Sequence, residues 1–392
     1  MPKNVIRTAA TTLLLCGSAM AQTAEESRAL TADLLADAAS RASALAAAPA
    51  PVTIGGALQF RYNINSRDNV PGNEDLATGF QTRLSTLWVT GEVAPGFTYR
   101  VQGNFDIDGG TFTLEDAYFL HALGDGGWFI GAGQLYFPVL WEDYVDKWRQ
   151  LGADYSPTNA AFRPDRVQGA FVHYSSESFR FWGAIDDGAG TANSDYTSMA
   201  EADYALTARG EWKFAGQWDR FADFTSFKGS DYAGKLGGAA HWQSGGETFA
   251  TGDMDIFLGT IDVCVEGSGW NAFAAGIYRM IDPSVGNSLD DFGFVLQGGI
   301  FVADQWELFG RYDISIPDDN DRPGDFSAFS TVTFGVNHYI SPESQSAKLT
   351  LDILYSPDKQ SESITPSSTI TGILADSEGD QFNFRVQMQL IF

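Results

Sequence analysis

The side chains able to do acid–base, nucleophilic or metal chemistry are scattered along this 392-residue chain and form no catalytic pattern. The sequence has no Gly-x-Ser-x-Gly elbow and no Gly-rich phosphate loop ending in Lys-Ser/Thr. The four histidines lie far apart and in no zinc-binding spacing: His121, His173, His241 and His338. We therefore expect no catalytic, cofactor-binding or metal-ligating residues and no enzymatic activity.

Acidic side chains are abundant, with 50 Asp and Glu against 24 Lys and Arg and a net charge of -26. Adjacent acids such as Glu115-Asp116 resemble glycosidase carboxylates, but in so acidic a chain solvated turns explain them better. Asp318-Asp319-Asn320-Asp321 has the carboxylate density of a calcium loop without the Gly and distal Glu of an EF-hand. Adventitious Ca²⁺ in acidic external loops is therefore one hypothesis, and nucleic acid is disfavoured as a partner.

Apolar and polar residues alternate from Thr53 to the end of the chain. The last twelve residues show it most clearly, since one face carries Phe382, Phe384, Val386, Met388, Leu390 and Phe392. The other face carries Gln381, Asn383, Arg385, Gln387 and Gln389. Such alternation predicts β-strands with one dry and one wet face, in a soluble sandwich or in a membrane barrel.

Strand length and number favour the barrel. Many segments reach about ten residues, which suits a tilted membrane strand better than a soluble one. We count about sixteen: 53–66, 79–92, 96–107, 112–122, 127–136, 167–174, 178–187, 202–214, 232–243, 252–263, 268–280, 291–302, 305–316, 327–340, 346–356 and 381–392. Aromatic residues near strand ends are expected to form lipid-facing girdles: Tyr62, Trp88, Phe105, Trp212, Tyr339 and Phe392. The predicted fold is all-β, a transmembrane antiparallel β-barrel of about 16 strands with a short N-terminal helical segment.

The expected connections alternate between short and long, as periplasmic turns and external loops do. The longest, 137–166, contains Trp141, Trp148, Arg149, Arg163 and Arg166. It either folds into the barrel and narrows it or caps the mouth, and the sequence leaves both open.

The N-terminus divides into two short regions before the barrel. Residues 1–21 have the basic start, apolar centre and small-residue end of a cleavable secretory signal peptide. Residues 22–51 are Ala-rich with roughly helical spacing, and form a periplasmic segment and linker. Residues 52–392 form the predicted barrel, exported to the cell outer membrane.

Arginines are the charged residues with a predicted place in such a barrel. An arginine facing lipid at mid-depth costs about 2–4 kcal/mol, so strand arginines should point into the lumen. The candidate pore-lining residues are Arg61, Arg83, Arg100, Arg166, Arg180, Arg209, Arg311 and Arg385. They make the wall either basic or, if each pairs with a carboxylate such as Asp116 or Glu211, nearly neutral.

The chain resembles the phosphate-selective porin O and P family, in particular its planctomycete-type outer-membrane porins. The resemblance rests on short motifs in order along the chain: Gly56-x-x-Gln59-x-Arg61-x-x-x-Asn65, Phe80-Gln81-Thr82-Arg83, Phe97-x-Tyr99-x-Val101-Gln102-x-x-Phe105, Leu114-Glu115-Asp116-Ala117-Tyr118, Gly133-Gln134-x-x-x-Pro138, Arg166-x-x-Gly169 and Gly379-Asp380-Gln381-Phe382. It implies a sixteen-stranded barrel, usually a homotrimer, that passes small solutes by diffusion. The sequence departs from the family at Leu135-Tyr136, where a basic residue is common, and lacks a ladder of arginine and lysine. Only the general porin role is therefore carried over.

Three functional hypotheses follow. The first is an outer-membrane porin with a water-filled channel for small hydrophilic solutes and ions, inserted among outer-membrane lipid by the barrel-assembly machinery that reads Phe392. The second is an anion-selective, phosphate-type channel with Arg83, Arg100 and Arg166 near its constriction. The third is a secreted β-rich binding protein or hydrolase.

Overall fold

The computed structural model describes residues 52–68, 75–105, 107, 109–248, 252–318 and 328–392. The expected signal peptide, the Ala-rich segment and most of the acidic run after Asp318 lie outside these residues. In the described part of the chain no helix combines the length and apolar character needed to cross a bilayer.

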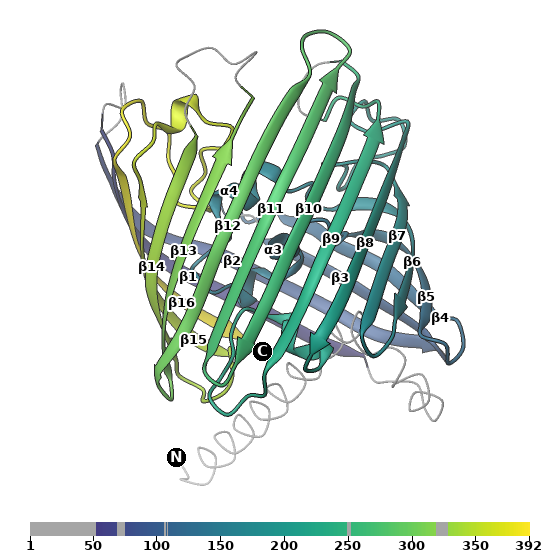
Figure 1. Ribbon diagram of the computed structural model, residues 1–392, viewed down its shortest axis with the longest axis horizontal. Coiled ribbons are helices and arrows are strands. Elements are labelled where there is room, and N and C mark those ends of the chain that lie inside the picture. The colour runs from purple at the N-terminus through teal and green to yellow at the C-terminus, as the bar shows by residue number, and fades with distance from the viewer. Residues whose placement is uncertain (1–51, 69–74, 106, 108, 249–251, 319–327) are drawn as a thin grey trace, which may run out of the picture.

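Sixteen antiparallel strands close into one barrel, which confirms the predicted fold and strand number (Figure 1). The strands are β1 (Thr53–Ser66), β2 (Leu76–Ala94), β3 (Phe97–Phe105), β4 (Phe112–Ala122), β5 (Trp128–Leu135), β6 (Val167–Ser175), β7 (Phe179–Asp186), β8 (Tyr204–Ala215), β9 (Ala233–Ser244), β10 (Met254–Gly267), β11 (Trp270–Pro283), β12 (Leu289–Ala303), β13 (Trp306–Ile316), β14 (Phe329–Tyr339), β15 (Ala347–Ser356) and β16 (Gln381–Ile391). The short helices are α3 (Trp141–Tyr144), η2 (Lys147–Arg149), α4 (Pro157–Phe162), η3 (Trp218–Ala222) and η4 (Gln360–Glu362).

The C-terminal strand closes the barrel by pairing with the first strand. Its register runs from Ala57 opposite Ile391 to Ser66 opposite Phe382. The Phe392 carbonyl accepts a 2.7 Å hydrogen bond from the Gly56 amide, and the Phe392 amide donates one of 3.0 Å back to the Gly56 carbonyl. Closure leaves the ring of strands without first and last edges, which would otherwise expose unpaired backbone groups.

The outer surface of the wall is apolar over most of its strands. Phe80, Phe334 and Leu296, from three different strands, are 72%, 66% and 58% exposed. The alternation places their polar neighbours inside, so the exterior is dry and the interior wet. So wide an exposed apolar surface is a cost for a protein surrounded by water and is suited to a lipid environment.

The prediction of lipid-facing girdle aromatics is wrong for two of the six residues. Trp88 and Tyr339 face the interior and are only 3% and 0% exposed. In β2 the cause is a bulge at Arg83, which has no partner residue on β1. The extra residue makes Arg83 and Leu84 both point inward and reverses the alternation for the rest of the strand. Tyr339 shares the inward face of Asn337 on β14, where its hydroxyl donates to a Glu307 oxygen at 2.6 Å.

Candidate functional site

The long connection between β5 and β6 folds into the barrel, which decides the alternative left open by the sequence. Figure 1 shows its helices α3 and α4 between the front and back strands. Its backbone carbonyls accept hydrogen bonds from inward side chains on separate parts of the wall. Thr260 on β10 donates to Val139 at 2.7 Å, and Lys348 on β15 donates to Gln150 at 2.8 Å. We call residues 136–166 the inward loop.

One buried attachment of the inward loop is the carboxylate of Asp154, which is 2% exposed. Arg61 on β1 donates from Nη2 to one carboxylate oxygen at 2.8 Å. Arg83 on β2 donates from Nη2 to the other at 2.9 Å and also from Nε to the first. Arg311 on β13 donates to the Asp154 backbone carbonyl at 2.9 Å. Strands from both sides of the seam where the barrel closes therefore hold this one residue.

Burial alone would raise the pKa of Asp154, but the neighbouring Arg83 and Arg61 guanidinium groups hold that pKa below its usual range. The carboxylate thus stays ionised across any ordinary assay pH. Two other loop acids behave differently, since burial outweighs their partners. It raises the pKa of Glu142 to about 6 despite Arg311 and Ser156, and that of Asp143 to about 6 despite Arg163.

Two carboxylates of the wall also anchor the loop by accepting hydrogen bonds from it. Asp352 on β15 accepts the Ala153 amide at 3.0 Å and is itself bound by Arg385 on β16 at 2.6 and 2.8 Å. Asp313 on β13 accepts both the amide and the hydroxyl of Thr158, at 3.0 and 2.9 Å. These bonds pair buried carboxylates with donors that are themselves buried, as a stable buried charge requires.

On the far wall, Arg209 on β8 forms the centre of a second charged cluster. It donates to both oxygens of Asp262 at 2.8 and 2.9 Å and to Glu211 at 3.1 and 2.9 Å. Its guanidinium carbon also lies 5.0 Å from the centre of the Trp141 ring of the inward loop. Lys235 on β9 shares Glu211 at 2.5 Å, so two cations and two carboxylates balance.

A third cluster joins β3 and β4 to the middle and the C-terminal end of the inward loop. Arg166 binds Asp116 at 2.6 Å, and Arg100 lies 3.4 Å from the same carboxylate. Lys147 donates to Glu115 at 2.7 Å. The loop itself therefore brings cations to a pair of wall acids.

All eight predicted arginines lie inside the barrel and are between 0% and 6% exposed. Seven of them make an ion pair with a carboxylate, although Arg61 and Arg83 share Asp154, and Arg100 and Arg166 share Asp116. The eighth, Arg180, lies 4.0 Å from the centre of the Trp218 ring. Several of the pairing carboxylates come from the inward loop rather than from strands, which strand-by-strand alternation does not predict.

A second segment enters the barrel from the end with the short turns. Residues 216–232 connect β8 to β9, and Trp218, Phe221 and Phe224 are buried inside. The Phe224 amide donates to the Arg149 carbonyl of the inward loop at 3.4 Å. Sequence reasoning missed this segment. Two features of the sequence could have indicated it. The connection is long although it lies at the end of the barrel with short turns, and it carries aromatic residues three positions apart.

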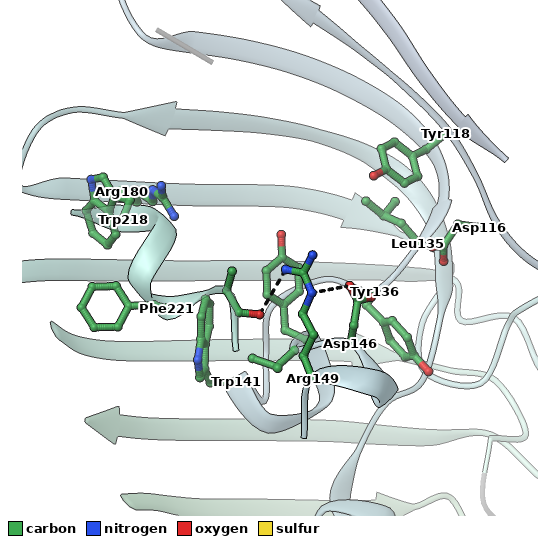
Figure 2. Close-up of a pocket in the computed structure, with 13 residues that line it drawn as sticks. Asp116, Tyr118, Leu135, Tyr136, Trp141, Asp146, Arg149, Arg180, Trp218 and Phe221 are labelled. Carbon is green, nitrogen blue, oxygen red and sulfur yellow. Dashed lines mark hydrogen bonds and ion pairs between the residues drawn. The ribbon is translucent and has the colours of Figure 1, made fainter. Parts of the chain in front are cut away.

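The two segments enclose a cavity of about 70 Å³ beside β4, β5 and β7 (Figure 2). Arg149 reaches into it and donates to the Ala222 carbonyl at 3.4 Å, with the Asp146 carboxylate 3.6 Å away. Arg180 and Tyr118 lie across the same space. In the described part of the chain no group of three or more His, Cys, Asp or Glu is arranged to hold a metal ion. The cavity is therefore small, and its lining is largely aromatic with a few charged side chains.

No protein-family model matches the chain, and no curated protein matches it. The fold is similar to that of several solved structures. The outer membrane channel DcaP of Acinetobacter baumannii is 13% identical, with a TM-score of 0.62 over 88% of this chain and 99% of that one. The anion-selective porin from Comamonas acidovorans is 14% identical, with a TM-score of 0.61 over 88% of this chain and 100% of that one. OmpT, an outer membrane protein of Vibrio cholerae in a form lacking loop L8, is 12% identical, with a TM-score of 0.60 over 88% and 99%. At sequence identities this low, the similarity is evidence for a shared fold alone.

Proposed function

We propose that this protein is an outer-membrane porin that lets small hydrophilic solutes and ions diffuse through its lumen. The observation that carries the proposal is the separation of surfaces: a closed sixteen-stranded wall is apolar outside and lined with charged and amide side chains inside. A lipid-facing exterior around a polar interior is the architecture of a channel. The likeness to channel and porin structures supports the same reading.

A secreted water-soluble protein, the third hypothesis, fits the exterior poorly. Phe80 and Phe334 would each be left largely exposed to water, at 72% and 66%, together with apolar side chains on most other strands. We therefore propose a non-enzymatic channel without a cofactor. Adventitious Ca²⁺ at external loops remains a separate proposal, since most of the acidic run after Asp318 lies outside the described residues.

The alternative function is an anion-selective channel. The pairing of the lumen arginines with carboxylates argues against strong anion selectivity. Each of the three proposed constriction arginines contacts a buried carboxylate. Arg83 contacts Asp154, Arg100 contacts Asp116, and Arg166 contacts both Asp116 and Glu115. Fixed lumen charge sets ion preference, and matched charge gives little of it. We propose a weakly selective channel rather than a phosphate-type one.

The cavity between the two inner segments has room for only a few water molecules. Passage of larger solutes therefore requires the inward loop to shift. Reconstitution into a planar bilayer tests the proposal directly, because a porin gives discrete conductance steps. A correctly folded, heat-modifiable protein that gives no steps at any modest voltage would exclude the channel function.

Three further expectations belong to this proposal. They are cleavage of residues 1–21, recognition of the terminal Phe392 by the barrel-assembly machinery, and a homotrimer as implied by the family resemblance. Cross-linking of the protein in native membranes tests the trimer. A single cross-linked species at the mass of one chain would exclude it.

A further inference from the structure

A cavity of about 410 Å³ lies at the end of the barrel that carries the long connections, separate from the cavity of Figure 2. Its volume falls in the range of ligand-binding pockets, about 300–1,000 Å³. β1, β2 and β16 form its wall, and the connection between β15 and β16 forms its floor. The polar residues that line it include Asn63, Asn65, Gln81, Thr369 and Asn383.

Four side-chain amide oxygens at this cavity have no hydrogen-bond donor among the described residues. They are Oδ1 of Asn63, Asn65 and Asn383, and Oε1 of Gln81. Asn65 and Asn383 are 3% and 1% exposed, so these are buried acceptors that lack a partner. Because a buried polar group without a partner costs about 1–3 kcal/mol, a convergence of four in one cavity calls for a ligand that donates hydrogen bonds.

The orientation of two of these amides is set by the backbone. Asn65 and Asn383 both donate from Nδ2 to the carbonyl of Gly372, at 3.1 and 3.0 Å. A carbonyl can only accept, so the nitrogens must face Gly372 and the oxygens must be turned away from it. Gly372 has φ +85, and a Cβ there would lie 2.0 Å from Nδ2 of Asn383, so only glycine allows this approach.

The floor of the cavity is held rigidly from below. Arg61 donates to the carbonyl of Ile370 at 2.8 Å, and Arg385 donates to that of Thr371 at 2.6 Å. Both arginines are fully buried and are paired with Asp154 and Asp352. The acceptors are therefore presented by a prearranged frame, which lowers the entropy lost when a ligand binds.

None of the described residues that line the cavity is charged. A cation would also satisfy unpaired oxygens, but it needs negative charge that the lining does not supply. The next inward positions on β1, β2 and β16 are the arginines Arg61, Arg83 and Arg385. They share the two carboxylates of Asp154 and Asp352, so the charge beneath the cavity does not favour a cation, and the acceptor oxygens do not favour an anion. A neutral ligand with several hydroxyl donors fits the acceptors and the electrostatics together.

We infer that this cavity is an entry site for neutral polyhydroxylated solutes of the saccharide type. The inference names a solute class for the proposed porin and rests on that function for its physiological meaning. Binding must stay weak, on the order of millimolar, because a solute that is held tightly cannot leave a channel.

The test measures calorimetric binding of glucose to the detergent-solubilised full-length protein, with glucosamine as the cationic comparator. We expect saturable glucose binding that weakens about 2- to 10-fold in N63L and in Q81L, since each removes one acceptor. Gln297→Leu is the matched control, because it removes an inward amide on β12 outside the cavity and should leave binding unchanged. Heat-modifiable gel mobility verifies that each variant is folded.

Absence of saturable glucose binding would overturn the inference, and so would binding that N63L and Q81L leave unchanged. Glucosamine bound more than tenfold tighter than glucose would overturn it too, because the site would then recognise an ammonium group. Conductance in planar bilayers separates the two proposals. Conductance steps without glucose binding would refute the saccharide site but not the porin function. Glucose binding without conductance steps would refute the porin function but not the site.

Discussion

Asp154→Asn should release the inward loop from the wall while leaving the barrel intact. The substitution keeps the shape of the side chain but removes the charge that Arg61 and Arg83 share at 2.8 and 2.9 Å. Those two guanidinium groups are 0% and 3% exposed, so neither reaches solvent while the loop is seated. Displacement of the loop would let water reach them, and the variant should therefore favour the displaced state.

The magnitude follows from the burial of all three partners. Removing one member of a buried ion pair costs about 3–5 kcal/mol, because the remaining charge is left uncompensated. Converted at about 1.4 kcal/mol per tenfold, this shifts the equilibrium between seated and displaced loop by roughly 10²- to 4 × 10³-fold. The Arg311 bond to the Asp154 carbonyl and the Asp352 bond to the Ala153 amide remain, so we expect frequent opening rather than complete loss of the seat.

Single-channel recording in planar bilayers is the assay, with mean conductance and open-channel noise as the readouts. We expect both to rise in D154N relative to the unmodified protein. Asp143→Asn is the matched control, since Asp143 is another buried loop carboxylate whose nearest cation, Arg163, is 3.7 Å away. Burial raises the pKa of Asp143 to about 6, so at pH 5 the control substitution only copies its protonated form. If folded D154N showed the same conductance and noise as D143N, the conclusion that the ion pairs of Asp154 hold the loop in place would be refuted.

Four other outcomes test the remaining reasoning. Burial raises the pKa of both Glu142 and Asp143 to about 6, above their usual values, so the seated loop takes up protons and is stabilised as pH falls through that window. Channel noise should therefore drop between pH 7 and 5, and Glu142→Gln should weaken this dependence while leaving the part that Asp143 contributes. The reversal potential in a KCl gradient should stay near zero, and a strong anion preference would contradict the paired lumen charges. Leu296→Arg on the lipid-facing wall should destabilise the barrel by about 2–4 kcal/mol in heat-modifiability assays, whereas Val285→Arg, in an exposed connection, should not. Gly372→Ala should lose glucose binding through the clash with Asn383 while keeping channel activity.

Much of the wall was predictable because alternation is a local property. In β1, β15 and β16 each residue's face follows from its neighbours, and the predicted ranges 53–66, 346–356 and 381–392 match the observed strands closely. The inward direction of Arg61, Arg209 and Arg385 followed from the same pattern and the cost of placing an arginine in lipid. About sixteen alternating segments, long enough to cross a membrane, were enough to predict a closed barrel.

What lies inside the wall was decided by the tertiary structure. Arg83 and Leu84 face the same side only because of a bulge, and alternation cannot reveal one extra residue. Asp154 lies 93 positions from Arg61 in the chain, so their pairing depends on how the barrel brings β1 opposite the inward loop. The four unpaired amide oxygens around Gly372 become a site only when three strands and a connection meet. Local periodicity determined which residues face inward, whereas the partners they meet there depend on closure of the ring, which no short stretch of sequence encodes.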